Sequence, residues 1–169
     1  MRRGAAFWIA CGFGSGLVPK APGTFGSLAA LVAGMAVLAI GPALLPLVAA
    51  AATIGGAWAI QACGADRGAK EDPGWVVIDE FAGQWIAMLP LVLLPDAALW
   101  NLPSLLLAFV AFRVLDIAKP GPIGLADRQA GAAGIMADDV IAGILAGVIV
   151  LLAQLLLPAW FAVPFPFAP

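Results

Sequence analysis

From Ala21 to Ala65 the chain carries no charged side chain over 45 consecutive residues. A helix that spans a membrane needs about 20 apolar residues, with a range of about 17–25. The uncharged stretch is therefore long enough for two spans, and Gly41, Pro42 and Pro46 supply the break between them. We predict membrane helices over residues 27–41 and 46–63.

The composition of the whole chain agrees with this prediction. Of its 169 residues 63% are hydrophobic and 11% are charged, and the mean hydropathy is +1.05. Soluble domains have about 45–50% apolar and about 25% charged residues. A net charge of −2 without a basic run also argues against a nucleic-acid partner. We expect residues 1–169 to form a single all-α membrane domain.

Three further apolar stretches complete a helical bundle of four to five spans. We predict spans over residues 76–94, 97–115 and 136–157. Pro95 and Asp96 separate the first two of these spans, and Pro158 ends the last. In a four-span alternative, residues 27–63 form a re-entrant hairpin. Residues 4–18 are expected to form an interfacial helix, and the aromatic, uncharged tail over residues 160–167 an anchor at the opposite interface.

The charged residues indicate the orientation of these spans. In the five-span arrangement all eight Lys and Arg residues, and 17 of the 18 charged residues, fall on one side of the membrane, with Asp96 as the exception. Lysine and arginine are enriched in cytoplasmic loops. We therefore expect a multi-pass protein whose charged loops face the cytoplasm.

Five carboxylates stand where predicted spans begin or end. Asp79 and Glu80 open the third span, Asp116 closes the fourth, and Asp138 and Asp139 open the fifth. If they converge, they repel one another unless a cation neutralises them. Carboxylate oxygens suit Mg²⁺, Mn²⁺ or Ca²⁺, whereas a chain without histidine is a poor zinc ligand. The alternative is that each acid only stabilises a helix N-terminus.

Two of the acidic segments share the pattern D-x-x-A-G, over residues 79–83 and 139–143. Small residues let membrane helices approach closely, and such an approach would bring the carboxylates within reach of one ion. Gly143 and Gly147 also have Gly-x-x-x-Gly spacing, which is compatible with an oligomer or with packing inside one chain.

Basic residues near these acids could bind an anion. Lys20 precedes a glycine-containing segment in which Thr24 or Ser27 could cap the first span. Arg113 lies three residues before Asp116, on the same helix face, and Lys119 follows in a proline-rich turn. Each of these residues could instead serve only as a cytoplasmic anchor.

Carboxylates that bind a metal beside an anion site at a membrane surface suggest phosphoryl chemistry on a lipid headgroup. The chain has no histidine nucleophile and no Cys-x5-Arg, Asp-x-Asp or Asp-Gly-x-x-Ala-Arg motif. Metal-assisted attack by water or by an aspartate remains. The alternatives are a small transporter or cation channel with an acidic ion path, and a structural membrane protein.

Four sequence blocks, over residues 19–27, 77–85, 112–120 and 134–143, resemble the phosphatidylglycerophosphatase A family. The resemblance implies a helical enzyme of the bacterial inner membrane that removes the terminal phosphate of phosphatidylglycerophosphate with Mg²⁺. Oligomerisation stays open. The candidate catalytic residues are Asp79, Asp116, Asp139, Lys20 and Arg113. The candidate substrate-binding residues are Lys20, Thr24, Arg113 and Lys119, and the candidate Mg²⁺ ligands are Asp79, Glu80, Asp116, Asp138 and Asp139.

Overall fold

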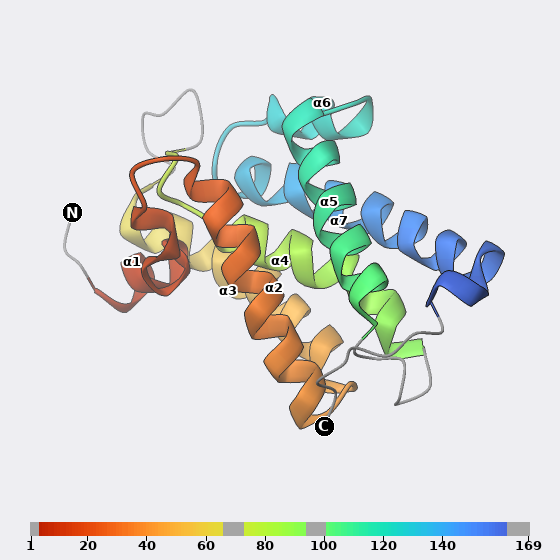
Figure 1. The fold of residues 1–169 in the computed structure, drawn as a ribbon. Coiled ribbons are helices and arrows are strands. Elements are labelled where there is room, and N and C mark those ends of the chain that lie inside the picture. Colours follow the sequence, from red (N-terminus) through yellow and green to blue (C-terminus); the bar gives the residue numbers. More distant parts are fainter. Residues whose placement is uncertain (1–3, 66–72, 94–100, 162–169) are drawn as a thin grey trace.

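The computed structural model describes residues 4–65, 73–93 and 101–161, and all the regular structure in these ranges is helical (Figure 1). The elements, in chain order, are α1 (Ala5–Ala10), η1 (Gly12–Leu17), α2 (Pro22–Ile40), α3 (Leu44–Cys63), α4 (Ile78–Ala87), η2 (Leu89–Leu93), α5 (Leu102–Ala118), α6 (Pro122–Asp127), α7 (Ala132–Leu156) and η4 (Pro158–Phe161).

Three of these helices, α2, α3 and α7, are long and apolar enough to cross a membrane. They correspond to the predicted spans at residues 27–41, 46–63 and 136–157. Helix α5 has 17 residues, which is at the lower limit of the usual length for a span. It begins at Leu102 and carries Pro103 in its first turn, a position where proline is well tolerated.

Helix α4 differs from the prediction of one helix over residues 76–94. It has ten residues, and a 3₁₀ segment, η2, follows it. Ten helical residues extend about 15 Å, against about 30 Å for the hydrocarbon core of a bilayer. Pro90 gives the reason, because a proline ring clashes with the carbonyl four residues earlier and offers no N–H donor.

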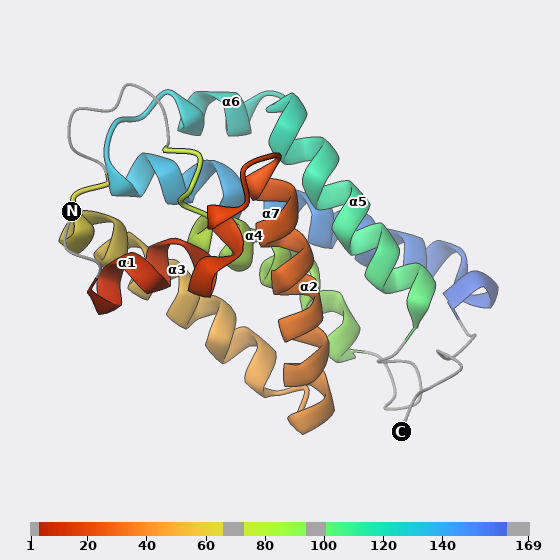
Figure 2. The ribbon, with the colours of Figure 1, turned by 60° about the vertical axis from the view of Figure 1, so that its left-hand side comes forward.

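Helix α4 lies at the centre of the bundle and contacts α2, α3, α5 and α7 (Figures 1 and 2). Its closest approach is to α7, where Gly83 faces Gly143. A Cβ atom on Gly143 would lie 2.9 Å from Gly83 Cα, and one on Gly83 would lie 2.7 Å from the carbonyl oxygen of Asp139. The two D-x-x-A-G segments therefore pack against each other, as their small residues predict.

The second glycine of the Gly-x-x-x-Gly pattern also faces the interior of the bundle. A Cβ atom on Gly147 would lie 3.3 Å from the carbonyl oxygen of Ile86. Packing within one chain therefore accounts for this pattern. The outer surface is apolar instead, with Val32, Ile54 and Leu155 each more than half exposed, as expected for helices that face lipid.

Buried polar side chains tie the helices together away from the carboxylates. The indole N–H of Trp85 in α4 donates to the carbonyl of Ala30 in α2, at 2.7 Å. Asn101 caps α5 by accepting from the amide of Ser104 at 2.8 Å, and Gln154 of α7 donates to the Ser104 hydroxyl at 3.1 Å. These bonds satisfy polar groups that would otherwise be costly to bury.

The segment at residues 4–18 is not the single interfacial helix that we predicted. It consists of α1, with six residues, and η1, inside which Phe13 and Gly14 have φ angles of 54° and 107°. Left-handed backbone of this kind interrupts a helix. The expectations for Asp96, for the charged loop at residues 66–72 and for most of the aromatic tail fall outside the described residues.

Candidate active site

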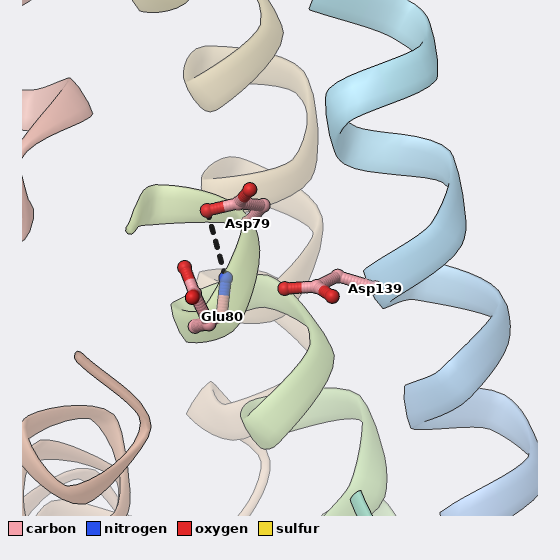
Figure 3. A group of neighbouring side chains, drawn as sticks. All are labelled: Asp79, Glu80 and Asp139. Carbon is pink, nitrogen blue, oxygen red and sulfur yellow. Dashed lines mark hydrogen bonds between the residues drawn. The ribbon is translucent and has the colours of Figure 1, made fainter. Parts of the chain in front are cut away.

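The structure brings the five carboxylates together from three helices. Asp79 and Glu80 lie in the first turn of α4, Asp116 in the last turn of α5, and Asp138 and Asp139 about two turns into α7. Carboxylate oxygens of Asp79, Glu80 and Asp139 lie within 4.8 Å of one another, and so do those of Asp116, Asp138 and Asp139. Figure 3 shows the first of these triads, with Asp139 directed from α7 toward α4.

Asp139 belongs to both triads and is the centre of the cluster. Its exposed fraction is 3%, and those of Asp79 and Asp138 are 3% and 7%. Ionised carboxylates are expensive to bury without compensating positive charge. Asp139 forms no ion pair within the described part of the chain, so no basic side chain there compensates its charge directly.

Arg113 of α5 provides positive charge on one side of the cluster. Its Nη1 donates to Asp116 Oδ2 at 2.6 Å, across one turn of the same helix, and it lies 3.9 Å from Glu80 Oε1. The same nitrogen donates to the Ser27 hydroxyl of α2 at 3.2 Å. Arg113 is thus held between α2, α4 and α5, with a side-chain exposure of 13%.

Lys119 provides positive charge on the other side. It ends α5 in a left-handed conformation, with φ at 45°, and its Nζ donates to Asp138 Oδ2 at 2.9 Å and to Asp127 of α6. Partial burial alone would lower the pKa of Lys119, but the hydrogen bonds to Asp127 and Asp138 outweigh it and raise that pKa above its ordinary value. Lys119 is therefore a permanent cation at physiological pH.

The first turn of α2 packs directly on this cluster. A Cβ atom on Gly23 would lie 3.3 Å from Arg113 Nη2 and 3.4 Å from Glu80 Cδ, so a larger residue here would displace the side chains of the cluster. Lys20 and Thr24 flank this position and are exposed, and neither has a side-chain hydrogen bond to another described residue. The structure therefore brings their segment to the cluster without engaging their side chains.

The expectation that Thr24 or Ser27 caps this helix is wrong. The N-cap is Ala21, with φ at 50°, and no side chain caps α2. Pro22 at the first helical position already lacks an N–H group, and this reduces the need for a cap. The Ser27 hydroxyl instead donates to the carbonyl of Gly23 at 2.9 Å and accepts from Arg113.

Sequence reasoning missed Ser27 and Asp127 as neighbours of the cluster. Ser27 lies one turn after Gly23, in the segment that also contains Lys20, so its spacing could have indicated a residue on the same helix face. Asp127 follows Lys119 by eight residues, and only the turn between α5 and α6 brings the two together. No spacing rule predicts that second contact.

The donor set fits a hard divalent cation. Within the described part of the chain, Arg113 and Lys119 are the cations that pair with these five carboxylates, so negative charge is in excess. Glu80 Oε2 is buried and has no hydrogen-bond partner within those residues. Oxygen ligands with a free carboxylate oxygen are what Mg²⁺ or Ca²⁺ prefers.

A family sequence model matches most of the chain. The sequence model described as "Phosphatidylglycerophosphatase A" matches residues 8–154, a range that includes all five carboxylates, Arg113 and Lys119. The chain belongs to the phosphatidylglycerophosphatase A family. The resemblance seen in the four sequence blocks is thereby confirmed.

Two relatives carry the name of the phosphatidylglycerophosphatase A family. The Haemophilus influenzae protein is 39% identical over 148 residues, with 86% of each chain covered. The Escherichia coli K12 protein is 38% identical over 138 residues, covering 81% of this chain and 76% of its own. A Bacteroides thetaiotaomicron protein, 38% identical over 151 residues and covering 86% of this chain and 91% of its own, is provisionally named as a phosphatidylinositol-3-phosphatase. No solved structure is significantly similar to the chain.

Proposed function

We propose that this protein is a Mg²⁺-dependent phosphatidylglycerophosphatase, which hydrolyses phosphatidylglycerophosphate to phosphatidylglycerol and phosphate. The observation that carries the proposal is the convergence of five carboxylates around Asp139, between Arg113 and Lys119, at one end of an apolar helical bundle. Membership of the phosphatidylglycerophosphatase A family and the names of two relatives support the choice of substrate.

The Mg²⁺ ligands in this proposal are the two carboxylate triads that share Asp139. When bound, the metal supplies Lewis-acid polarisation of the phosphate and activation of the nucleophile. The buried, unpartnered Oε2 of Glu80 is the ligand atom that stands ready without first breaking a hydrogen bond within the described part of the chain.

The chain's own residues would then position and neutralise the phosphate. Arg113 and Lys119 flank the carboxylates and offset the charge that develops on the phosphate oxygens. Lys20, Thr24 and the uncapped first turn of α2 would bind the remaining headgroup oxygens. In a chain without histidine, one of the carboxylates takes the proton of an attacking water.

The nucleophile is either water or one of the aspartates. A single turnover quenched with acid distinguishes these routes, because only nucleophilic attack by an aspartate leaves phosphate covalently bound to the protein. We also propose that the charged end of the bundle faces the cytoplasm in a bacterial inner membrane, since lysine and arginine are enriched on that side.

Phosphate release from defined lipids tests the proposed activity. The protein, purified in detergent, should hydrolyse phosphatidylglycerophosphate in the presence of Mg²⁺ and lose that activity in EDTA. Phosphatidylinositol 3-phosphate is the comparison substrate, because a relative carries that activity in its name. Faster hydrolysis of the inositol lipid would reassign the substrate, and metal flux into liposomes without hydrolysis would favour the ion-transport alternative.

Asp139→Asn is the decisive variant, since Asp139 is common to both triads. It removes one charge at nearly constant shape, and we expect turnover to fall by at least about 10²-fold, the scale of losing one electrostatic contact in a catalytic centre. Gln154→Leu is the matched control: it removes another buried polar group of α7, about 22 Å along the helix at 1.5 Å per residue. Near-normal turnover in Asp139→Asn would refute the site.

A further inference from the structure

A groove of about 500 Å³ runs along α2 next to η1, outside the carboxylate cluster. Its lining is almost entirely apolar. Ser15 and Val18 line one side, and α2 provides the rest, with three larger side chains beside a floor of alanines: Phe25, Leu28, Val32, Ala29, Ala33 and Ala36.

The outer side of the groove is exposed, with Phe25, Leu28 and Val32 at 47%, 45% and 61%, whereas Ala29 and Ala33 in its floor are half-buried against the core. Another face of α2 carries Gly23, Gly26 and Gly34, which pack on Arg113, on Val77 and on α4. Three alanines in the groove, at a spacing of three and four residues, form a continuous shallow channel instead of a ridge. The channel therefore opens to the side from which lipid approaches.

The length of the groove along α2 matches the hydrocarbon thickness of one leaflet. It extends from Phe25 to Ala36, a rise of about 16 Å at 1.5 Å per residue. Half of the hydrocarbon core of a bilayer is about 15 Å. The groove starts in the first turn of α2, at the end of the bundle that carries the carboxylates, so it occupies the leaflet on that side.

The wall of the groove is fixed to the segment that leads into the candidate active site. A Cβ atom on Gly16 of η1 would lie 3.0 Å from Val77 Cγ1, and the amide of Val77 donates to the carbonyl of Ala10 at 2.9 Å. Val77 is two residues before Asp79. Lys20 is exposed and lies in the short connection between Val18, which lines the groove, and the start of α2 at Pro22.

We propose that this groove binds one acyl chain of the phospholipid substrate and so places its headgroup over the first turn of α2. This inference rests on the proposed function. A helix with its side chains is about 10–12 Å across. The glycerol phosphate headgroup is long enough to cross the end of α2 at Gly23 and bring its terminal phosphate to Arg113 and the carboxylates.

A second apolar groove, of about 440 Å³, lies between α3, α4, η2 and α7. It begins near Pro46, at the start of α3, and follows η2, so it lies toward the end of the bundle away from the carboxylates. An acyl chain there would belong to a lipid of the other leaflet. This groove therefore does not compete for the substrate chain.

The test places a bulky side chain in the groove and compares a substrate that has acyl chains with one that lacks them. In Ala36→Trp, at an exposed position of the groove, we expect kcat/KM for a dipalmitoyl substrate to fall by about tenfold or more, because misplacing a substrate by 1 Å can cost about 10²-fold. Activity on the headgroup without acyl chains should stay within about twofold, since the chemistry is untouched. Ala51→Trp, on the exposed face of α3, is the matched control and should behave as wild type.

Equal loss on both substrates, or equal loss in Ala36→Trp and Ala51→Trp, would overturn the proposal. A second readout does not depend on catalysis: a phosphatidylglycerol that carries a photoreactive diazirine in one chain is crosslinked to wild-type protein in vesicles. Crosslinks concentrated between Phe25 and Ala36 support the groove, and crosslinks spread evenly over α2, α3 and α7 contradict it. If wild-type protein hydrolyses neither substrate, the proposed function fails while the crosslinks still decide the groove.

Discussion

Replacing Gly143 by alanine should separate the two helices that carry the central carboxylates. The new Cβ atom would lie 2.9 Å from Gly83 Cα and 3.0 Å from its carbonyl carbon, whereas carbon atoms pack at about 3.5–4.0 Å. The clash is with backbone, so no side-chain rotation relieves it. Helices α4 and α7 must therefore move apart by roughly 1 Å at this contact.

The size of the effect follows from two opposing terms. Overpacking of this kind costs about 1–3 kcal/mol, while exchanging glycine for alanine in a helix gains about 1 kcal/mol. Gly55→Ala isolates the second term, because a Cβ atom on Gly55 has no neighbour within 4 Å. We expect the unfolding free energy of Gly143→Ala to lie about 1–3 kcal/mol below that of Gly55→Ala, since both variants share the propensity gain.

The functional consequence should exceed the loss of stability. Asp139 lies one turn from Gly143 on α7, and a Cβ atom on Gly83 would lie 2.7 Å from its carbonyl oxygen, so a separation of the helices at this contact also moves Asp139. A displacement of about 1 Å costs up to about 10²-fold in rate. Thermal unfolding in detergent and phosphate release at saturating Mg²⁺ measure the two effects. If Gly143→Ala matched Gly55→Ala in both, close packing of α4 and α7 would not be what assembles the site.

Three further outcomes are expected. Ser27→Ala should lower kcat/KM by about tenfold, because a hydrogen bond to a charged group is worth about 1.5–3 kcal/mol and Arg113 loses one of its acceptors. Thr53→Ala removes the same kind of hydroxyl-to-carbonyl bond in α3 and should leave kinetics unchanged, so equal effects in the two variants would contradict this role for Ser27. Asn101→Ala should lower the unfolding free energy by at least about 1 kcal/mol, with kcat intact, because it removes the cap of α5 and the hydrogen bond that Asn101 donates to the carbonyl of Phe161. Removing divalent cations should lower the thermal midpoint, because carboxylates that repel one another lose their counter-ion, and an unchanged midpoint in EDTA would argue that no ion is bound.

Much of the bundle could be predicted because apolar length and charge position are local signals. The uncharged stretch from Ala21 to Ala65 with its Gly41-Pro42 break became α2 and α3, and the repeated D-x-x-A-G pattern became the contact between Gly83 and Gly143. Arg113 and Asp116 pair because residues three apart share a helix face. Each of these inferences needs only helix geometry and the cost of burying charge.

The contacts that could not be predicted depend on how the helices are arranged in space. Nothing in the sequence places Ser27 beside Arg113, 86 residues away, or makes Gly23 the point where α2 meets Glu80. The shortness of α4 is a different case, because Pro90 is visible inside the apolar stretch from residue 76 to residue 94 and could have predicted the end of the helix. Periodicity gives the face of a helix, whereas neighbours follow from the packing of all the helices together.

The short helix at the centre explains how an acidic cluster can exist in so apolar a chain. Backbone that is not helical is tolerated at membrane depth only where protein encloses it. The break after α4 meets this condition, because Met88, Pro90 and Leu91 are all buried. The same enclosure by α2, α3, α5 and α7 keeps Asp79 away from lipid, while the outer faces of those helices remain apolar. A full-length α4 at the periphery would expose one face to lipid along its whole length. It could then not present carboxylates to three neighbouring helices at once.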